Sequence, residues 1–284
     1  MEEAGIYFMS VSVESWSGKT KSDENFPVGS ILIRSDLRPH IHAFYNFARI
    51  ADDIADHETF EANEKIFRLN VMEDVLIGRS DEGAPSALEL RQSLAQSGVS
   101  PIHAQELLIA FRQDAIKSRY DDYAELAAYC RYSAAPVGRY VLDLHGEDQA
   151  SWTASDALCK SLQILNHLQD CQKDLTLLDR CYLPLDRLAA HGTSIEALRA
   201  SALTPGLRAV LDELLAIVRQ LNQRAAMLPG HVKARGLRVE CGVIVNLAER
   251  LTEHLQVRDP LAQRVKLKTF DVVGSIFSSL RFIP

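Results

Sequence analysis

The apolar side chains of this sequence recur at intervals of three and four residues along most of its length. The run from Leu211 to Leu221 is typical, because Leu214, Leu215 and Val218 keep that interval between its two ends. This is the period of one helix face, whereas a half-buried strand alternates apolar and polar residues. The sequence therefore predicts an all-α fold in which helices bury their apolar faces against one another.

Glycine and proline residues separate these periodic segments and mark where helices end. Between them we expect eight or nine helices, spanning roughly 36–57, 61–77, 86–96, 101–118, 122–145, 154–177, 206–228, 232–257 and 260–280. We find no long low-complexity joint and no repeat of fixed period in the sequence. We therefore expect a single domain over residues 1–284.

Composition narrows the class of partner. The chain is 47% hydrophobic and 24% charged, with a formal net charge of −7, which disfavours binding to nucleic acid through non-specific phosphate contacts. No apolar run approaches the roughly 18 residues of a spanning helix. The acidic N-terminus does not resemble a secretory signal, and the five cysteines form no C-x-x-C pair. We expect a cytoplasmic protein that binds a small molecule or another protein.

The expected last helix, 260–280, mixes apolar residues with Arg264, Lys266 and Lys268. A helix of this composition can lie at a membrane surface, which would place the protein at the inner membrane face as a peripheral protein. It can also pack on the protein core. We favour core packing and keep the membrane contact as an alternative.

One segment gathers carboxylates on a single helix face. At about 100° per residue, Tyr45, Arg49, Asp52 and Asp56 fall within an arc of roughly 60°, with Asp53 beside it. Carboxylates four residues apart repel one another and weaken a helix unless a cation lies between them. The arrangement points to a cation-binding face.

A second segment carries Asn166, Asp170 and Asp174 within roughly 80°, opposite a row of leucines. Either face by itself is more often a solvated helix surface. Two such faces beside apolar segments, with Arg49 and Lys173 nearby, favour a diphosphate held by Mg²⁺ between helices, because hard oxygen ligands suit that ion. Such a site can neutralise a diphosphate leaving group while an apolar cavity shelters the carbocation.

Four stretches of sequence resemble the squalene and phytoene synthase family of trans-isoprenoid enzymes. They are FYNFARIADDIAD (44–56), AAYCRYSAAPVGRYVL (127–142), LQILNHLQDCQKDL (162–175) and DRCYLP (179–184). The resemblance runs from about residue 23 to beyond residue 184. It implies an isoprenoid-synthase-type helical bundle, with one all-α domain around a central cavity.

The resemblance also implies roles for particular residues. The expected metal ligands are Asp52, Asp56, Asn166, Asp170 and Asp174, of which Asp52 and Asp170 are also counted with Tyr45 and Tyr129 as catalytic. The two tyrosines resemble aromatic residues that face the reacting carbons or the diphosphate. The expected substrate-binding residues are Arg49, Phe26, Phe44, Gln169, Lys173 and Arg180, and Phe47 is a further candidate for the cavity wall.

Two departures from the family pattern narrow the assignment. Condensing members usually carry Arg where this chain has Gln169, and they usually read Ser-x-Ser-Phe where this chain has residues 23–27, DENFP. Fewer cationic groups suit an enzyme that receives one diphosphate substrate. DENFPV, ADDIAD and LNHLQDCQKD resemble the bacterial branch, often linked to hopanoid synthesis, that makes hydroxysqualene.

That branch implies a lyase-type reaction in which presqualene diphosphate is ionised, its cyclopropylcarbinyl cation rearranges, and water captures the product. Mg²⁺ would be needed and NADPH would not, in keeping with the lack of a G-x-G-x-x-G motif after a strand. Companion enzymes of squalene synthesis are expected partners. The alternative is a transferase that condenses two prenyl diphosphates into presqualene diphosphate, squalene or phytoene.

Two further classes are disfavoured. A di-iron bundle needs E-x-x-H motifs on two helices, and no glutamate here has a histidine three residues later. A non-catalytic scaffold related to the family would be expected to have lost part of its acidic sets, and both are complete.

Overall fold

The computed structural model describes residues 12–15 and 32–279. Every α-helix and 3-10 helix in that part of the chain is accounted for by two groups of elements. The first group is α1 (Arg38–Ala55), α2 (Ala62–Leu76), α3 (Pro85–Ser97), α4 (Ile102–Asp114), α5 (Tyr123–Ser133), α6 (Ala135–Leu144) and η2 (Gln149–Ser151). The second is α7 (Trp152–Leu178), α8 (Leu185–Ala190), η3 (Ile195–Arg199), α9 (Pro205–Ala225), α10 (Leu228–His231), α11 (Arg235–Val257) and α12 (Thr269–Ser279).

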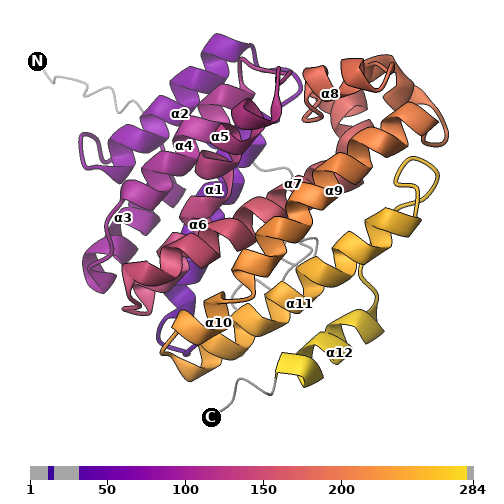
Figure 1. Ribbon diagram of the computed structural model, residues 1–284. Coiled ribbons are helices and arrows are strands. Elements are labelled where there is room, and N and C mark those ends of the chain that lie inside the picture. Colours follow the sequence, from indigo (N-terminus) through magenta and orange to yellow (C-terminus); the bar gives the residue numbers. More distant parts are fainter. Residues whose placement is uncertain (1–11, 16–31, 280–284) are drawn as a thin grey trace, which may run out of the picture.

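Helix α7 is the longest element and lies in the middle of the bundle (Figure 1). It packs against α5, α6, α9 and α11, while α1 packs against α2, α3 and α4. Two clusters of buried apolar side chains fill these two halves. Helix α6 joins them, because Leu142 belongs to one cluster whereas Tyr140 and Leu144 belong to the other. The expected all-α bundle is confirmed.

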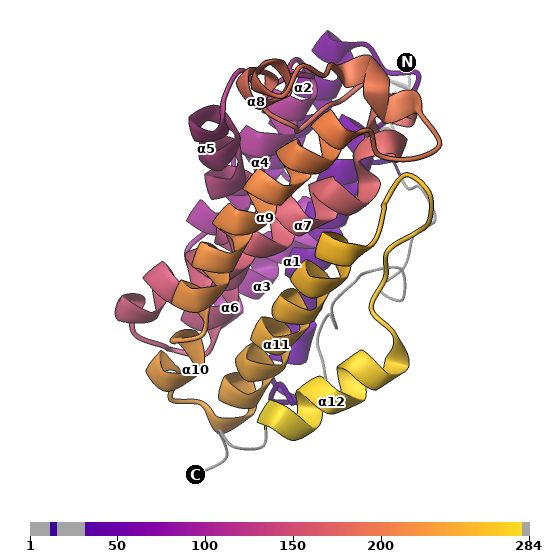
Figure 2. The same cartoon turned by 45° about the vertical axis from the view of Figure 1, so that its right-hand side comes forward.

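A buried chain of polar side chains connects the three long helices. Ser161 on α7 donates to the amide oxygen of Asn222 on α9, and the Asn222 amide nitrogen donates to Thr252 Oγ1 on α11 at 3.1 Å. Figure 2 shows these helices running side by side. Buried polar groups lose free energy when left without partners, so this chain favours one relative alignment of the helices.

The segment 122–145 forms two helices instead of the one that we expected. Helix α5 ends and α6 begins around Ala134, where φ is −129° and ψ is −46°. Pro136 follows within the first turn of α6. Its ring has no N–H and clashes with the carbonyl four residues earlier, so a continuous helix is disfavoured at this point.

The last helix begins at Thr269, nine residues later than expected. The stretch before it, 264–268, is not helical: Val265 is buried and Leu267 half-buried, while Lys266 and Lys268 are exposed. This period of two is that of an extended chain. The short helices α8 and α10 were not expected either, because four to six residues are too few to show a period.

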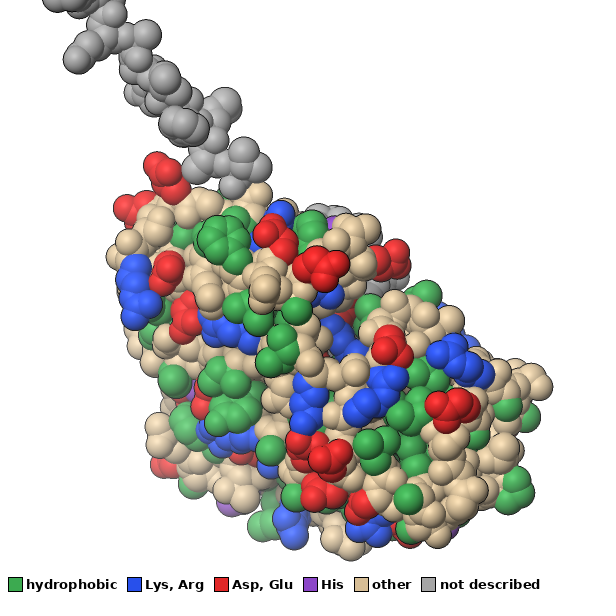
Figure 3. All heavy atoms as spheres, turned by 90° about the horizontal axis from the view of Figure 1, so that it is seen from above, with side chains coloured by type: hydrophobic (Ala, Val, Ile, Leu, Met, Phe, Trp, Pro, Cys, Tyr) green, Lys and Arg blue, Asp and Glu red, His purple; other side chains and the backbone are tan. Residues whose placement is uncertain are grey.

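Helix α12 packs on α11 through polar residues. Asp271, Ser275 and Ser279 are buried, and Asn246 of α11 donates to Ser279 Oγ at 3.0 Å. Core packing, the favoured interpretation, therefore describes this face, while a membrane contact stays a prediction. Within the described ranges, no helix has both the length and the hydropathy that crossing a bilayer requires. Charged and apolar side chains are interspersed over the face seen in Figure 3.

Close packing of α6 on α7 depends on Gly138. A Cβ atom at that position would lie 2.3 Å from Ser155 Oγ and 2.7 Å from Cys159 Sγ. We expect Gly138→Ala to lower the free energy of unfolding by about 1–3 kcal/mol, the usual cost of overpacking. Gly230→Ala is the matched control, since a Cβ there meets no atom within 4 Å. Chemical denaturation of both variants measures the difference, and equal stabilities would contradict the prediction.

Candidate active site

A pocket of about 800 Å³ lies between α1 and α7. It brings together the two oxygen-rich helix faces, because its lining includes Asp52 and Asp56 from one helix and Asn166, Asp170 and Asp174 from the other. Positions 124 residues or fewer apart in the chain thus face one space. The pocket also takes in side chains from the ends of α4 and α5 and from the segment after α7.

On the α1 side, the cation of Arg49 is held by its own helix. Its Nη2 lies 2.6 Å from Asp53 Oδ1 and 3.1 Å from Asp52 Oδ2. These are i,i+4 and i,i+3 pairs, the separations at which helical side chains meet. Asp53 is buried, with 6% exposed. Arg49 therefore compensates a buried carboxylate and still lines the pocket.

On the α7 side, carboxylates crowd one another. Burial raises the pKa of Asp174 to about 7, and the nearby carboxylates of Asp170 and Asp56 raise it further than Lys173 and Arg180 lower it. Negative charge is thus in excess at this point, and oxygen ligands with excess negative charge fit a hard divalent cation.

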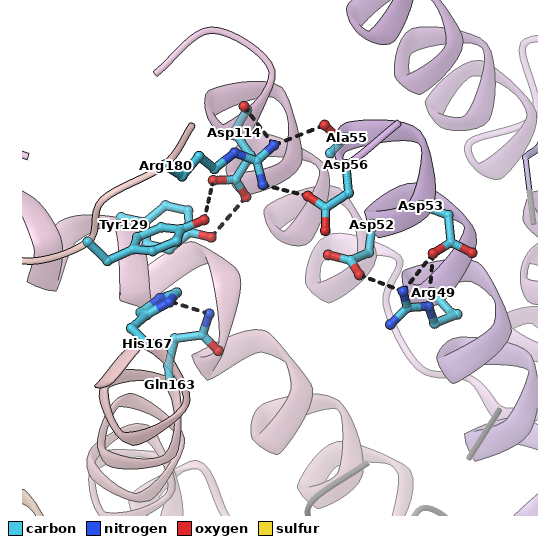
Figure 4. A network of polar contacts seen from close by, with 11 residues as sticks. Arg49, Asp52, Asp53, Ala55, Asp56, Asp114, Tyr129, Gln163, His167 and Arg180 are labelled. Atoms are coloured by element: carbon cyan, nitrogen blue, oxygen red, sulfur yellow. Dashed lines mark hydrogen bonds and ion pairs between the residues drawn. The ribbon is translucent and has the colours of Figure 1, made fainter. Parts of the chain in front are cut away.

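Arg180 joins the ends of three helices. Asp179 at the end of α7 has a φ of 50°, in the left-handed region, and the chain turns there so that Arg180 reaches back into the bundle. Its guanidinium donates to Ala55 O and Asp114 O, both at 2.9 Å, and to Asp56 Oδ1 at 2.5 Å (Figure 4). Asp114 and Asp56 raise the pKa of Arg180 although burial opposes its charge. It stays charged and orients Asp56.

An aromatic wall lies beside the charged part of the pocket. Tyr129 and Tyr182 donate their hydroxyls to the two carboxylate oxygens of Asp114, at 2.8 and 3.1 Å. Burial raises the pKa of Asp114 to about 6 even though Arg180 is close. The same carboxylate and burial hold the pKa of Tyr129 well above its ordinary value, so both phenols keep their protons.

His167 completes this wall. Its ring stacks on Tyr182 with centroids 3.6 Å apart, and its Nε2 lies 3.2 Å from Gln163 Nε2 (Figure 4). Burial, with a smaller contribution from Arg180, lowers the pKa of His167 to about 3. The imidazole is therefore neutral at neutral pH.

The pocket includes many, though not all, of the residues predicted from the sequence. The predicted residues on its lining are Arg49, Asp52, Asp56, Tyr129, Asn166, Asp170, Lys173, Asp174 and Arg180. Tyr45, Phe44, Phe47 and Gln169 are not among the described residues that line it. Phe44 is buried and stacks on Tyr140 at 3.9 Å, and Gln169 Nε2 donates to Val265 O at 2.6 Å. Phe26 lies outside the described residues.

Other lining residues were not expected from the sequence. Asp114, Tyr182, Gln163 and His167 are the main examples. Asp114 is a lone carboxylate at the end of a helix and shows no pattern, so nothing in the sequence singles it out. His167 and Tyr182 lie inside the quoted motifs LQILNHLQDCQKDL and DRCYLP, and their spacing relative to the acidic residues is the one available signal.

The site has no preformed metal centre of the usual protein-only kind. Among the described residues, no three His, Cys, Asp or Glu side chains are grouped closely enough to hold an ion by themselves. Mg²⁺ is ordinarily bound by one or two carboxylates, with waters and substrate phosphates completing its shell. The excess carboxylate charge around Asp174 fits ions of that kind arriving with a diphosphate.

The fold and the facing acidic helices define a helical protein of the isoprenoid synthase type. A model of the squalene/phytoene synthase family matches residues 19–271, and the chain belongs to that family. Hydroxysqualene synthase of Rhodopseudomonas palustris is 47% identical over 96% of this chain and 93% of its own. That of Sinorhizobium fredii is 45% identical over 88% and 86%.

A solved structure is also similar. The squalene synthase HpnC from Alicyclobacillus acidocaldarius superposes with a TM-score of 0.71 at 30% identity, over 82% of this chain and 89% of the other. Its likeness extends the family relationship from sequence to the arrangement of the helices.

The charge on Asp174 gives a prediction about stability. Its pKa is about 7 when folded and 3.8 ordinarily, so ionisation opposes folding, with no penalty below about pH 4 and the full penalty above about pH 7. In EDTA, we expect Asp174→Asn to stabilise the protein by about 1–3 kcal/mol at pH 8 and by less at pH 5. Thermal unfolding at the two pH values measures this.

Asp121→Asn serves as the control, because Asp121 is an exposed aspartate away from the pocket. It should leave stability nearly unchanged at both pH values. A stabilisation by Asp174→Asn that does not grow with pH would contradict the electrostatic account.

Proposed function

We propose that this protein converts presqualene diphosphate and water into hydroxysqualene and diphosphate. The observation that carries the proposal is the single pocket in which two carboxylate-bearing helix faces meet a wall of uncharged aromatic rings. The names of the two relatives support the same reaction. The first half of such a pocket suits a leaving diphosphate and the second half suits the carbocation that remains.

The acidic half would hold the leaving group through metal ions. Asp52, Asp56, Asn166, Asp170 and Asp174 are the residues that would hold Mg²⁺. Bound Mg²⁺ supplies Lewis-acid stabilisation of the negative charge that develops on the leaving group.

The cationic side chains of the pocket would bind phosphate oxygens directly. Lys173 and Arg264 lie on the lining, and Arg49 can turn part of its charge to the diphosphate while it compensates Asp53. Arg180 is committed to Asp56 and to two backbone carbonyls. We assign it to orienting Asp56 and to keeping the ends of α1 and α4 together.

The aromatic half would stabilise the cation. The π-faces of Tyr129 and Tyr182 attract positive charge, and their hydroxyls are occupied by Asp114. The neutral His167 adds no opposing charge. The overall conversion exchanges diphosphate for water and leaves the oxidation level unchanged, so it needs no nicotinamide cofactor.

The competing function is condensation of two prenyl diphosphates. It requires cationic groups for a second diphosphate, and Gln169 is uncharged, with its amide bound to the carbonyl of Val265. This observation favours the single-diphosphate reaction. Because the substrate and product carry long apolar chains, we also propose a cytoplasmic protein in peripheral contact with the inner membrane face and with the companion enzymes that supply its substrate.

The two functions separate in one assay. Purified protein is incubated with Mg²⁺ and either presqualene diphosphate or farnesyl diphosphate, and products are identified by mass spectrometry. We expect a hydroxylated C30 alcohol from presqualene diphosphate and no C30 product from farnesyl diphosphate. Conversion of farnesyl diphosphate would assign the condensing reaction instead.

The metal-binding role of the acidic faces is tested by Asp52→Ala and Asp170→Ala. Each should lower turnover at least about 100-fold, because stabilisation of the leaving group is lost, while the circular dichroism spectrum is unchanged. EDTA should likewise stop the wild-type reaction. Asp121→Ala, at an exposed aspartate, should keep full activity. Wild-type rates in both pocket variants would remove the metal-site assignment.

A further inference from the structure

The polar stripe of α7 changes in chemical character along the helix. Gln163 and His167 lie on the same lining face as Asp170 and Asp174, at helical spacings of four, three and four. At about 1.5 Å of rise per residue, His167 is displaced about 5 Å, and Gln163 about 10 Å, from Asp170 along the axis. The carboxylates occupy one end and an uncharged hydrogen-bonding pair occupies the other. A prenyl diphosphate held at the acidic end would extend its reacting carbons toward the uncharged pair.

The surroundings of His167 fix its ring. It has 8% of its surface exposed, stacks on Tyr182 at an angle of 17°, and lies 6.0 Å from the ring of Tyr129. Both tyrosines are held by Asp114, which accepts their hydroxyl protons. Their hydroxyls are therefore engaged with that carboxylate. Among the described residues, Gln163 is the one hydrogen-bond partner of His167.

The pair keeps a hydrogen-bond acceptor whichever way it is arranged. If the Gln163 amide nitrogen donates to His167 Nε2, the amide oxygen remains as an acceptor. If the amide is turned over, its oxygen accepts from Nε2–H and Nδ1 of the ring is the acceptor. Either arrangement can receive a proton of a water molecule and leave an oxygen lone pair of that water directed elsewhere.

We propose that Gln163 and His167 hold the water molecule that captures the carbocation, and that they thereby select the alcohol as product. This inference rests on the proposed function. The water oxygen lone pair forms the new C–O bond, the resulting oxonium loses one proton to the diphosphate released in the same pocket, and alcohol and diphosphate remain. Without the held water, the cation loses a proton from a neighbouring carbon to give a hydrocarbon, or is captured at other carbons.

The test compares product choice with ionisation. His167→Leu and Gln163→Met remove hydrogen-bonding atoms at similar side-chain volume. Each variant is incubated with Mg²⁺ and presqualene diphosphate, diphosphate release is measured as the rate of ionisation, and the C30 products are separated by mass. We expect the ratio of hydroxysqualene to other C30 products to fall about tenfold, the effect of losing one hydrogen bond in the product-determining step. Diphosphate release should change less than about threefold.

Two further variants control for structural effects. Gln172→Met makes the same substitution elsewhere on α7, where the Gln172 amide donates to Leu198 O and Ala200 O. It should leave the product ratio unchanged. His167→Asn keeps an amide acceptor near the ring position and should restore part of the alcohol that His167→Leu loses, which a purely packing role would not do.

The outcomes distinguish the two proposals. If wild-type protein makes no hydroxylated product from presqualene diphosphate, the proposed function fails. If wild-type protein makes hydroxysqualene and the ratio is unchanged in His167→Leu and Gln163→Met, the water-holding role is overturned and the function stands. A parallel fall of diphosphate release and alcohol, with the ratio constant, also overturns it. If His167→Leu does not fold, the ratio in Gln163→Met decides.

Discussion

Repulsion between carboxylates on two facing helices is the constraint on which this structure depends. Asp56 of α1 and Asp170 of α7 both raise the pKa of Asp174, to about 7, in a site that burial has already deprived of water. Such crowding lowers stability in the metal-free protein, so the rest of the fold has to hold the helices in place. The Ser161–Asn222–Thr252 chain and the apolar packing of α6, α9 and α11 on α7 do so from behind. Arg180 does so from the front, where it offsets part of the charge at Asp56.

A second feature follows from the buried carboxylate of Asp114. It is shielded from the pocket by the hydroxyls of two tyrosines and lies beside the Arg180 guanidinium. By accepting both phenolic protons it fixes two aromatic faces, and one of these faces fixes His167 by stacking. The pocket thus passes from charged to uncharged within one helix length of α7. That change matches the two demands of diphosphate ionisation, which needs strong electrostatic stabilisation at the leaving group and a weakly nucleophilic environment around the cation.

The differences between expected and observed elements have local causes. Pro136 divides a helix that periodicity alone would continue, because it lacks the N–H that the helix requires. The segment 264–268 is extended, and there Val265 enters the core while its carbonyl accepts from Gln169. That contact was invisible in the sequence, where Gln169 stood out only as the lack of a positive charge. Phe44, on the same helix as the acidic residues, stacks on Tyr140, because residues three or four positions from a lining residue need not share its direction once the helix is packed on both sides.

The sequence by itself determined the helical class, the identity of the two acidic faces and the family, since all three are carried by spacings within single helices. Only the tertiary structure decided that Asp114, Tyr182, Gln163 and His167 join those faces in one pocket. Asp114 lies 66 positions before Arg180, and their contact through the Asp114 carbonyl exists because the chain turns at Asp179 and returns to the end of α4. Periodicity reports which side of a helix is buried, but it carries no information about which other helix that side will meet. The partners of each buried charge are therefore set by packing, and it is packing that turns two acidic ridges into a single site.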